Sequence, residues 1–328
     1  MKTVLLTGAN GFLGGHICRE LVRRGYGVRA FIRPGADQQT LDSLPVDIWH
    51  GDLLDKDNVR AAVYGCDAII HAGAVASVNP ARDPHVRAVN IQGTATTVMA
   101  ALQAQVQRYV YVGTANVFGF GSKAYPGTEQ SPYRGRPYGL DYMDSKRAAT
   151  DLVLDAVQRE GLPGILVHPT FMVGPIDYKI TSNALLLALA RGHVPAIPAG
   201  GKNYVHVADV AVATVNALTL GRVGESYILG NENMSYRESF RLMSQTLGVR
   251  PPRLLLPRPV AQLVGWLGDR RADLSQRPSP INAAMAAVSN DEHYFSVSKA
   301  VHELKLPQTP IRVAVEQAVA WFRRHGSL

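Results

Sequence analysis

Thr7-Gly8-Ala9-Asn10-Gly11-Phe12-Leu13-Gly14 is a glycine-rich stretch that directly follows a short apolar run, Val4–Thr7, and opens a helix-like segment, Gly15–Arg24. Its glycines have the spacing Gly-x-x-Gly-x-x-Gly. Glycines at a strand-to-helix junction let backbone amides approach a pyrophosphate, and the helix N-terminus adds partial positive charge. A glycine triplet by itself also fits a tight turn, so the interpretation as a nucleotide-binding loop depends on its strand and helix context.

Short apolar runs and longer helix-like segments alternate through the first half of the chain. This rhythm is typical of βαβ units and predicts an α/β fold with a Rossmann-type, doubly wound parallel sheet. The expected strands are Val4–Thr7, Val28–Ile32, Asp47–His50, Ala68–His71, Tyr109–Gly113 and Ile165–His168. Right-handed crossovers would place Gly15–Arg24 and Thr94–Gln105 on the faces of the sheet, and the strand carboxyl ends would form one ligand-binding edge.

After Pro169 the alternation gives way to proline- and glycine-rich connections with isolated helical stretches, which predicts a smaller, mainly C-terminal substrate domain. The expected helices are Ser182–Arg191, Tyr236–Leu247 and Arg312–Arg324. Strand-like runs at Tyr204–Val207 and Tyr227–Leu229 predict a return to the main sheet. We therefore expect a dinucleotide-binding domain of residues 1–170 with 204–230, and a substrate domain of residues 171–203 with 231–328.

The overall composition is that of an ordinary globular protein. Hydrophobic residues make up 46% of the chain, and no stretch approaches the ~18 apolar residues that a membrane span needs. No signal peptide is visible, so a cytoplasmic location is expected. Cys18 and Cys66 form no disulfide framework and have no neighbouring ligands at metal spacing, so no metal is expected. The net charge of +8 comes from scattered residues, which favours a solvated basic surface over a nucleic-acid site.

Ile32-Arg33 stands where the second strand ends, about 20 residues after the glycine motif, the place at which NAD-preferring folds carry an acidic residue. An arginine can pair bidentately with a 2′-phosphate, so NADP(H) is predicted as the preferred cofactor, with NAD(H) as the alternative. Arg33 precedes Pro34 and also fits a plain surface position in a turn.

Further cofactor contacts are expected wherever a strand of the sheet ends, because a bound dinucleotide must lie along that edge. Asp52-Leu53 follows the third strand, and the small residues Ala72-Gly73-Ala74 follow the fourth. The predicted cofactor-binding set comprises Gly8, Asn10, Gly11, Phe12, Leu13, Gly14, Arg33, Asp52, Leu53, Ala72, Gly73 and Ala74.

Tyr142 and Lys146 are four residues apart, which places a phenol and an ammonium on one face if the segment is helical. A nearby positive charge stabilises a phenolate and lowers the tyrosine pKa from about 10, which suits the group to proton exchange near neutral pH. A Tyr-x-x-x-Lys spacing also occurs on exposed helix faces by chance.

Taken together, these motifs resemble those of the extended short-chain dehydrogenases/reductases. The glycine motif, Asn90-x-x-Gly93-Thr94, Tyr142-x-x-x-Lys146 and Val205-His206-Val207-x-Asp209 occur in the family order, and the resemblance covers nearly the whole chain. Within the family the chain is most similar to dihydroflavonol-reductase-like reductases and to hopanoid-associated sugar epimerase-like proteins.

The resemblance implies the remaining site residues. Thr114 stands at the position of the family's catalytic Ser or Thr, and Tyr142 and Lys146 take the proton-transfer and ribose-binding roles. Pro169 and Val173 would lie beside the nicotinamide, while His168 stands where an arginine is more usual and receives no role. Apolar or polar substrate contacts are expected from Asn116, Phe118, Met172, Tyr178 and Leu185.

The resemblance implies hydride transfer between a nicotinamide and a ketone or secondary alcohol, a small-molecule substrate. A nucleotide-sugar epimerase or dehydratase is the alternative, although Asn203, beside Lys202, stands where such enzymes usually carry an arginine. A non-catalytic NADP-binding sensor is a second alternative, which the retained Tyr142 and Lys146 disfavour. A membrane-bound steroid dehydrogenase lacks support, since no span or amphipathic anchor is visible.

Two further expectations concern the structure rather than the chemistry. His206, between apolar Val205 and Val207 on an expected strand, is interpreted as a structural histidine, and Asp209 as the cap of a helix beginning at Val210. By resemblance, a homodimer is expected through helices that include Thr94–Gln105 and Tyr142–Gln158.

Overall fold

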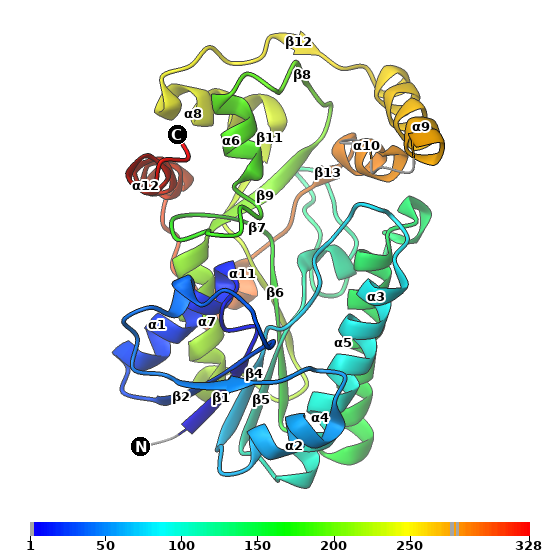
Figure 1. The fold of residues 1–328 in the computed structure, drawn as a ribbon. Helices are drawn as coiled ribbons and strands as arrows, with labels where there is room; N and C mark the ends of the chain where they lie inside the picture. The colour runs from blue at the N-terminus through cyan, green and yellow to red at the C-terminus, as the bar shows by residue number, and fades with distance from the viewer. Residues whose placement is uncertain (1–2, 276–278, 280–281) are drawn as a thin grey trace.

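A large parallel sheet with helices on both faces organises the protein in the computed structural model, which describes residues 3–275, 279 and 282–328 (Figure 1). The strand order is β10-β6-β5-β4-β1-β2-β3, and every neighbouring pair is parallel. The strands are β1 (Thr3–Thr7), β2 (Gly27–Ile32), β3 (Asp47–His50), β4 (Ala68–His71), β5 (Arg108–Val112), β6 (Gly164–Pro169) and β10 (Ser226–Leu229). The predicted Rossmann-type α/β fold is confirmed.

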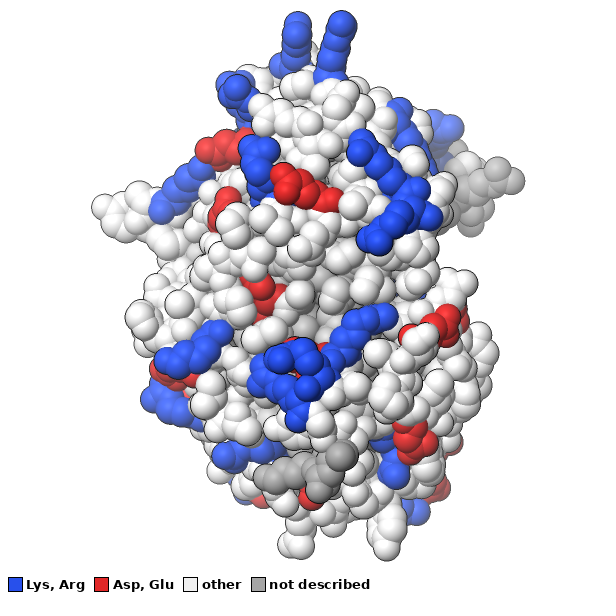
Figure 2. Space-filling view, turned by 90° about the vertical axis from the view of Figure 1, so that its left-hand side faces the viewer, with Lys and Arg blue, Asp and Glu red and all other residues white. Residues whose placement is uncertain are grey.

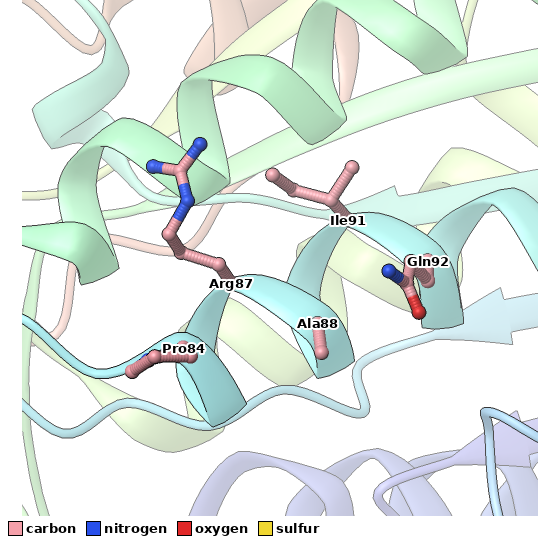
Figure 3. A pocket seen from close by; sticks show the side chains of 5 residues that line it. All are labelled: Pro84, Arg87, Ala88, Ile91 and Gln92. Carbon is pink, nitrogen blue, oxygen red and sulfur yellow. The ribbon is translucent and has the colours of Figure 1, made fainter.

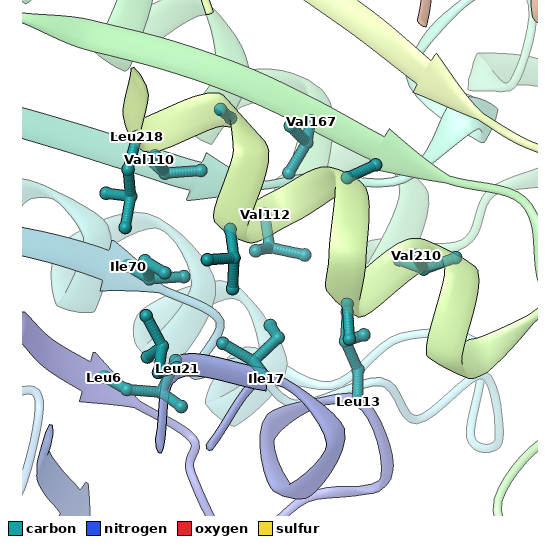
Figure 4. Close-up of a cluster of buried hydrophobic side chains, with 14 of the residues drawn as sticks. Leu6, Leu13, Ile17, Leu21, Ile70, Val110, Val112, Val167, Val210 and Leu218 are labelled. Carbon is teal, nitrogen blue, oxygen red and sulfur yellow. The ribbon is translucent and has the colours of Figure 1, made fainter. Parts of the chain in front are cut away.

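The helices after these strands cover the two faces of the sheet, as right-handed crossovers require. On one face, α1 and α7 pack against Leu6, Ile70, Val110 and Val167 of the central strands (Figure 4). The opposite face packs against α2, α4 and α5. Because both faces are covered, the strands are apolar without alternation, which is why the sequence shows them as continuous apolar runs.

Three helices of this larger unit, α1, α4 and α5, begin and end within about three residues of the expected segments. The helices of the unit are α1 (Phe12–Arg23), α2 (Lys56–Val63), α3 (Pro84–Arg87), α4 (Gly93–Gln103), α5 (Asp141–Glu160) and α7 (Val207–Leu220), with α11 (Ser298–Glu303) beside β10. Short helical turns lie at η1 (Gln39–Leu41), η2 (Ala88–Gln92, a π-helix), η3 (Ala115–Val117) and η4 (Arg136–Tyr138).

The smaller unit lies above the carboxyl ends of the large sheet (Figure 1). Its sheet has the order β11-β9-β13, with β7 also paired to β9, and a two-stranded ribbon pairs β8 with β12. The strands are β7 (Phe171–Val173), β8 (Ala196–Ile197), β9 (Gly201–His206), β11 (Glu232–Ser235), β12 (Leu254–Leu255) and β13 (Glu292–His293). The helices are α6 (Ala184–Ala190), α8 (Tyr236–Leu247), α9 (Arg258–Ser275), α10 (Ala283–Ser289) and α12 (Ile311–Arg324).

The strand predicted at Tyr204–Val207 does not return to the large sheet, so its expected place in that sheet is wrong, while the expected division into domains stays a prediction. β9 pairs with β7, β11 and β13 of the smaller sheet, and the chain rejoins the larger unit at Val207, where α7 begins. A buried apolar strand has the same pattern in either sheet, so the sequence could not assign it. β10, in contrast, joins β6 in the large sheet as predicted.

The junction between β9 and α7 also corrects the predicted helix cap. His206 is the N-cap of α7: its Nδ1 accepts a hydrogen bond from the Ala208 N–H (2.9 Å), and its Nε2 lies 3.0 Å from Gln317 Oε1. Asp209 instead accepts hydrogen bonds from the Thr309 N–H and hydroxyl (2.8 and 2.9 Å). His206 therefore has a structural role, as expected, while Asp209 anchors the segment before α12.

Positive and negative side chains are interspersed on the face shown in Figure 2. Glu20 of α1 forms salt bridges with Arg23 and Arg24. None of the described helices is long and apolar enough to cross a membrane.

Candidate active site

The glycine-rich turn between β1 and α1 forms a cradle that only glycine can line. Gly8 has φ +69°, and a Cβ there would lie 2.8 Å from the Gly73 Cα after β4. A Cβ on Gly14 would overlap the Gly8 carbonyl oxygen. α1 begins at Phe12 with Gly11 as N-cap and has no side-chain cap, so its first N–H groups are available to an anion. This geometry fits the pyrophosphate of a dinucleotide.

A buried histidine connects the cradle to the helices behind it. Thr7 Oγ1 accepts a hydrogen bond from the Gly73 N–H (3.0 Å) and lies 2.7 Å from His71 Nδ1. His71 Nε2 lies 3.1 Å from Thr94 Oγ1, which in turn donates to the Asn90 carbonyl (2.7 Å). Since Thr94 uses its proton on Asn90, His71 must donate from Nε2 and accept at Nδ1. Burial, aided by the charge of Lys146, lowers the pKa of His71 to about 3 and keeps it neutral.

Asn90, in the π-helix η2, ties the loop after β4 to the helix that carries the tyrosine and lysine. Its Nδ2 donates to the Val75 carbonyl and to Ser145 Oγ, both at 3.0 Å, and its Oδ1 accepts from the Val75 N–H (2.8 Å). π-helical turns often occur at functional sites. The Asn90-x-x-Gly93-Thr94 motif thus holds the cofactor edge and α5 in a fixed relation.

α5 presents Tyr142 and Lys146 one turn apart on the same face. Lys146 Nζ donates a hydrogen bond to the Val112 carbonyl at the end of β5 (2.7 Å) and lies 4.5 Å from the centre of the Tyr111 ring. Burial lowers the pKa of Lys146 from 10.5 to about 7. The ammonium therefore lies at the carboxyl end of β5, on the same edge of the sheet as the glycine cradle between β1 and α1.

The expected lowering of the Tyr142 pKa is wrong in sign. Burial raises the pKa of Tyr142 above its ordinary value of 10, and a hydrogen bond with the Thr114 side chain only partly opposes this effect. Burial penalises the charged phenolate more than the neighbouring side chains stabilise it. The Thr114 side chain thus lies within hydrogen-bonding distance of Tyr142, and the catalytic role of Thr114 stays a prediction.

His168, on β6, is fully buried beside this constellation. Its ring makes an edge contact with Phe118 (4.8 Å between centres), and its Nε2 lies 3.3 Å from Ser226 Oγ. Burial, together with the charge of Lys146, lowers the pKa of His168 to about 3. The imidazole is therefore neutral and packs as part of the sheet.

The predicted cofactor residues lie along one edge but contact the protein in different ways. Asn10 Nδ2 donates to the Asp37 carbonyl (2.7 Å) and so holds the loop after β2 against the cradle. Leu53 packs against Gly73 and Gly93, where any Cβ would crowd it. The side chains of Phe12, Leu13, Pro169 and Val173 are buried, Asp52, Ala74 and Arg33 are exposed, and Ala72 is half-buried.

A second cation, Lys179, lies near Arg33 although it comes from the loop between β7 and α6. Partial burial lowers the pKa of Lys179, and the positive charge of Arg33 lowers it further. The same loop crosses α1, since His16 Nε2 lies 3.0 Å from the Pro175 carbonyl oxygen. No sequence spacing links residues 33 and 179, so this neighbour could not be predicted.

The predicted substrate residues are dispersed in the structure. Phe118 is buried in a small cluster with Ile228 and Phe295. Tyr178 makes an edge contact with Trp321 (5.0 Å between ring centres) in the core of the smaller unit, where Leu185 is half-buried. Asn116 and Met172 are half-buried near the sheet edge. Their contact with a substrate stays a prediction.

Three aromatic side chains to which the sequence analysis gave no role, Phe120, Tyr138 and His293, form a group that reaches the apolar cluster of Tyr142. The His293 ring makes a tilted contact with Phe120 (4.1 Å between ring centres) and lies 6.0 Å from the ring of Tyr138, which packs in the same apolar cluster as Tyr142. Lys202 is the register partner of His293 across β9 and β13. Burial lowers the pKa of Lys202 to about 8 and that of His293, helped by Lys202, to about 3. Phe120 and Tyr138 belong to the loop that leads into α5. Their position shortly before Tyr142 was the one feature of the sequence from which their proximity to it could have been predicted.

Asn203 is fully occupied by the protein itself. Its Oδ1 accepts hydrogen bonds from Thr170 Oγ1 (2.9 Å) and the Asn231 N–H (3.0 Å), and its Nδ2 donates to Asn233 Oδ1 (2.8 Å). Only 1% of the residue is exposed. It links β9 and β11 to Thr170, the residue between β6 and β7, and presents nothing to a ligand.

A hollow of about 310 Å³ lies away from this site, on the outer surface of α3 and η2 (Figure 3). It is lined by Pro84, Arg87, Ala88, Ile91 and Gln92. η2 packs against α5, so the hollow borders the surface expected to form a dimer.

Comparison with known proteins identifies the family. Residues 4–230 match the NAD dependent epimerase/dehydratase family. A Synechocystis sp. protein named "Putative dihydroflavonol 4-reductase" is 33% identical over 98% of this chain and 94% of its own length. "Sterol demethylase protein B" of Methylococcus capsulatus is 30% identical over 99% of this chain and 100% of its own length. The crystal structure of gox2253 is 33% identical, with a TM-score of 0.88 over 100% of both chains.

The chain therefore belongs to the NAD dependent epimerase/dehydratase family, the extended short-chain dehydrogenases/reductases, and the predicted resemblance is confirmed. It is an enzyme that binds a nicotinamide cofactor and acts on CH–OH or C=O groups.

Proposed function

We propose that this enzyme is an NADP(H)-dependent oxidoreductase that interconverts a ketone and a secondary alcohol, with Thr114, Tyr142 and Lys146 as catalytic residues. The observation that carries the proposal is the closed environment of Asn203. Nucleotide-sugar enzymes of the family usually carry an arginine at this position to bind a diphosphate. Here the Asn203 side-chain amide is hydrogen-bonded to Thr170, Asn231 and Asn233 instead. A substrate without a nucleotide handle fits this arrangement.

When bound, the nicotinamide supplies or accepts the hydride at the substrate carbon. For reduction, Tyr142 donates its phenolic proton to the carbonyl oxygen, and the raised pKa keeps that proton in place at neutral pH. Thr114, in contact with Tyr142, supports the same oxygen through its hydroxyl. Lys146 is positioned to hold the nicotinamide ribose, and its pKa of about 7 lets it return a proton to the site.

The preference for NADP(H) is supported by two cations, Arg33 and Lys179, that lie near each other after β2 and after β7. Burial is the main cause of the lowered pKa of Lys179; the charge of Arg33 lowers it further, and the charge of Asp37 raises it. A 2′-phosphate beside Arg33 and Lys179 would remove the repulsion between them and accept charge-assisted hydrogen bonds. The ribose 2′-hydroxyl of NAD(H) is uncharged, so it would gain much less binding free energy from these two cations.

An apolar, ring-bearing substrate is supported by the aromatic residues near Tyr142. Phe120 stacks on Tyr138, which belongs to the apolar cluster that contains Tyr142, and His293 makes tilted contacts with both rings. The names of two relatives refer to a dihydroflavonol and to a sterol, both of which are ring systems.

The expected homodimer through α4 and α5 is part of this proposal. Met99 on α4 is exposed and would contribute an apolar contact to the dimer interface.

The test is oxidation of NADPH and NADH by the purified protein over a panel of cyclic ketones, β-keto esters and flavanonols. We expect NADPH-dependent reduction that disappears in Tyr142→Phe. Epimerisation of UDP-sugars is assayed in parallel. Activity confined to those sugars, with the cofactor never released, would establish the epimerase alternative, and an absence of any turnover would favour the sensor.

The cofactor proposal is tested with Arg33→Ala and Lys179→Ala. Each substitution is expected to raise the KM for NADPH by about tenfold, as for the loss of one charged hydrogen bond. The KM for NADH in the same variants is the matched control and should change little. An equal rise for both cofactors would refute a role in binding the 2′-phosphate.

A further inference from the structure

Helix α9 presents a row of large apolar side chains to solvent. Val260, Leu263, Trp266 and Leu267 are 45%, 55%, 51% and 52% exposed, and Val264 is exposed between them. At the helical increment of about 100° per residue these five positions fall within an arc of about 160°. Single exposed apolar residues are ordinary, but a continuous face on one helix indicates a binding surface.

The opposite face of α9 is made of small residues and packs on α10. Ala261 is buried, and a Cβ on Gly265 would lie 2.7 Å from the Ala283 Cα, so the two helices are in backbone contact there. Asp269 Oδ2 accepts a hydrogen bond from the Ala283 N–H (3.1 Å), which fixes the rotation of α9. α10 lies between α9 and the rest of the protein, so the apolar face points outward (Figure 1).

Arginines flank this apolar face. Residues 250–275 contain five arginines and two aspartates, a net charge of +3. Arg270 and Arg271 are exposed in the last turns of α9, and Arg250 and Arg253 are exposed in the segment before it. The Arg270 guanidinium lies over the Trp266 ring, 5.4 Å from its centre, so a cation covers one face of the indole. A bulky apolar face that carries tryptophan and is bordered by cations is typical of helices that lie in the interface of an anionic bilayer.

We propose that α9 docks this protein peripherally on an anionic lipid surface. A second copy of the chain fits the face less well. In a symmetric dimer, residues 250–275 of the two copies would face each other, and their charges of +3 would repel. A standard interface also needs about 20–30 residues a side, whereas this face consists of a single helix. Anionic headgroups complement the arginines, and Val260, Leu263, Trp266 and Leu267 insert into the boundary of the acyl chains.

Docking through α9 would bring the active site close to the lipid. Ala284 of α10 lies in the same apolar cluster as Leu140, Met143 and Tyr142 of the catalytic segment. α10 therefore contacts the bilayer-facing helix on one side and the catalytic helix on the other. A substrate dissolved in the bilayer would reach Tyr142 without crossing bulk water. This last step rests on the proposed function, whereas the docking does not.

The docking is tested by sedimentation of the purified full chain with vesicles of equal parts phosphatidylglycerol and phosphatidylcholine, without substrate. We expect the protein to sediment with these vesicles and not with pure phosphatidylcholine. Leu263→Gln with Leu267→Gln should lower the partition coefficient about tenfold or more, which equals about 1.4 kcal/mol. Arg270→Gln with Arg271→Gln should lower it by about fivefold per arginine on the anionic vesicles only.

The matched control is Leu220→Gln, because Leu220 at the end of α7 is 45% exposed and lies outside the proposed surface. It should bind vesicles like the unchanged protein. Thermal unfolding and NADPH oxidation with a water-soluble ketone should be unchanged in all the variants. Failure of the unchanged protein to bind anionic vesicles would overturn the proposal, as would equal binding by the double leucine variant. A dimer that the leucine substitutions dissociate, without vesicle binding, would show that a second copy covers the face.

Discussion

Lys146→Met is expected to abolish turnover and to make the cofactor-free protein more stable. Lys146 is 4% exposed, and burial lowers its pKa from 10.5 to about 7. The folded state therefore disfavours the ammonium that the unfolded chain carries freely. Methionine fills a similar volume without a charge, and cores accept such replacements well. The position would thus be retained for chemistry at the expense of the fold.

The size of the expected stabilisation follows from the shift in the pKa of Lys146. At 1.36 kcal/mol per pKa unit, the change from 10.5 to about 7 amounts to a penalty of about 4 kcal/mol at pH 7. Methionine leaves the Val112 carbonyl without its donor, which costs about 1–2 kcal/mol. We therefore expect Lys146→Met to raise the free energy of unfolding by about 2–3 kcal/mol at pH 7.

The pH dependence has a definite sign. Since the folded pKa of Lys146 lies below the unfolded value, the unfolded chain binds more protons between pH 7 and 10.5, and stability rises with pH in that window. The unchanged protein should gain about 2 kcal/mol between pH 7 and 9 relative to Lys146→Met. The advantage of the variant would shrink accordingly.

Urea unfolding of cofactor-free protein at pH 7 and pH 9 measures both quantities. Tyr142→Phe is the matched control, because it removes turnover without removing a buried cation, and its stability relative to the unchanged protein should not depend on pH in this range. If Lys146→Met is less stable than the unchanged protein at pH 7, or if the difference is the same at both pH values, the reasoning is refuted.

Four further predictions concern other parts of the molecule. Gly14→Ala would force a Cβ onto the Gly8 carbonyl oxygen, so we expect a loss of about 2 kcal/mol or more and no stabilisation by NADPH in thermal unfolding; normal cofactor binding would contradict this. Thr114→Val should lower kcat about 10²-fold or more with the KM for NADPH unchanged, because it removes a hydroxyl beside Tyr142; a KM effect alone would argue against catalysis. His206→Ala removes the cap of α7 and should cost about 1–2 kcal/mol in urea unfolding, while an undiminished stability would show that the cap is dispensable. Burial raises the pKa of Cys18 to about 12 and also raises that of Cys66, so thiol reagents at pH 8 should label neither until the protein is denatured; rapid labelling of native protein would refute this.

The sequence predicted the elements whose signal is local. The six strands expected before Pro169 match β1 to β6 within a residue or two at each end, because buried parallel strands are continuous apolar runs between turn residues. The glycine motif and the Tyr142–Lys146 spacing likewise describe neighbours along one turn or one helix, and the structure places both at the strand ends.

What depends on contacts between distant segments was decided only by the tertiary structure. The sequence could not assign β9 to the smaller sheet, bring Lys179 to Arg33, or reveal that Asn203 is spent on three partners, since each requires knowledge of which strands and loops become neighbours. It predicted a lowered pKa for Tyr142 from the charge of Lys146, but the depth of burial reverses the direction.

The same limit applies to the surface of α9. From the sequence alone, its leucines and Trp266 are as compatible with a core helix as with an exposed one, and no membrane partner is expected. Only the packing of Ala261 and Gly265 against α10 turns the bulky face outward. Local patterns specify elements and motifs because their periods lie within a few residues, whereas burial, pairing and surface identity are properties of the assembled chain.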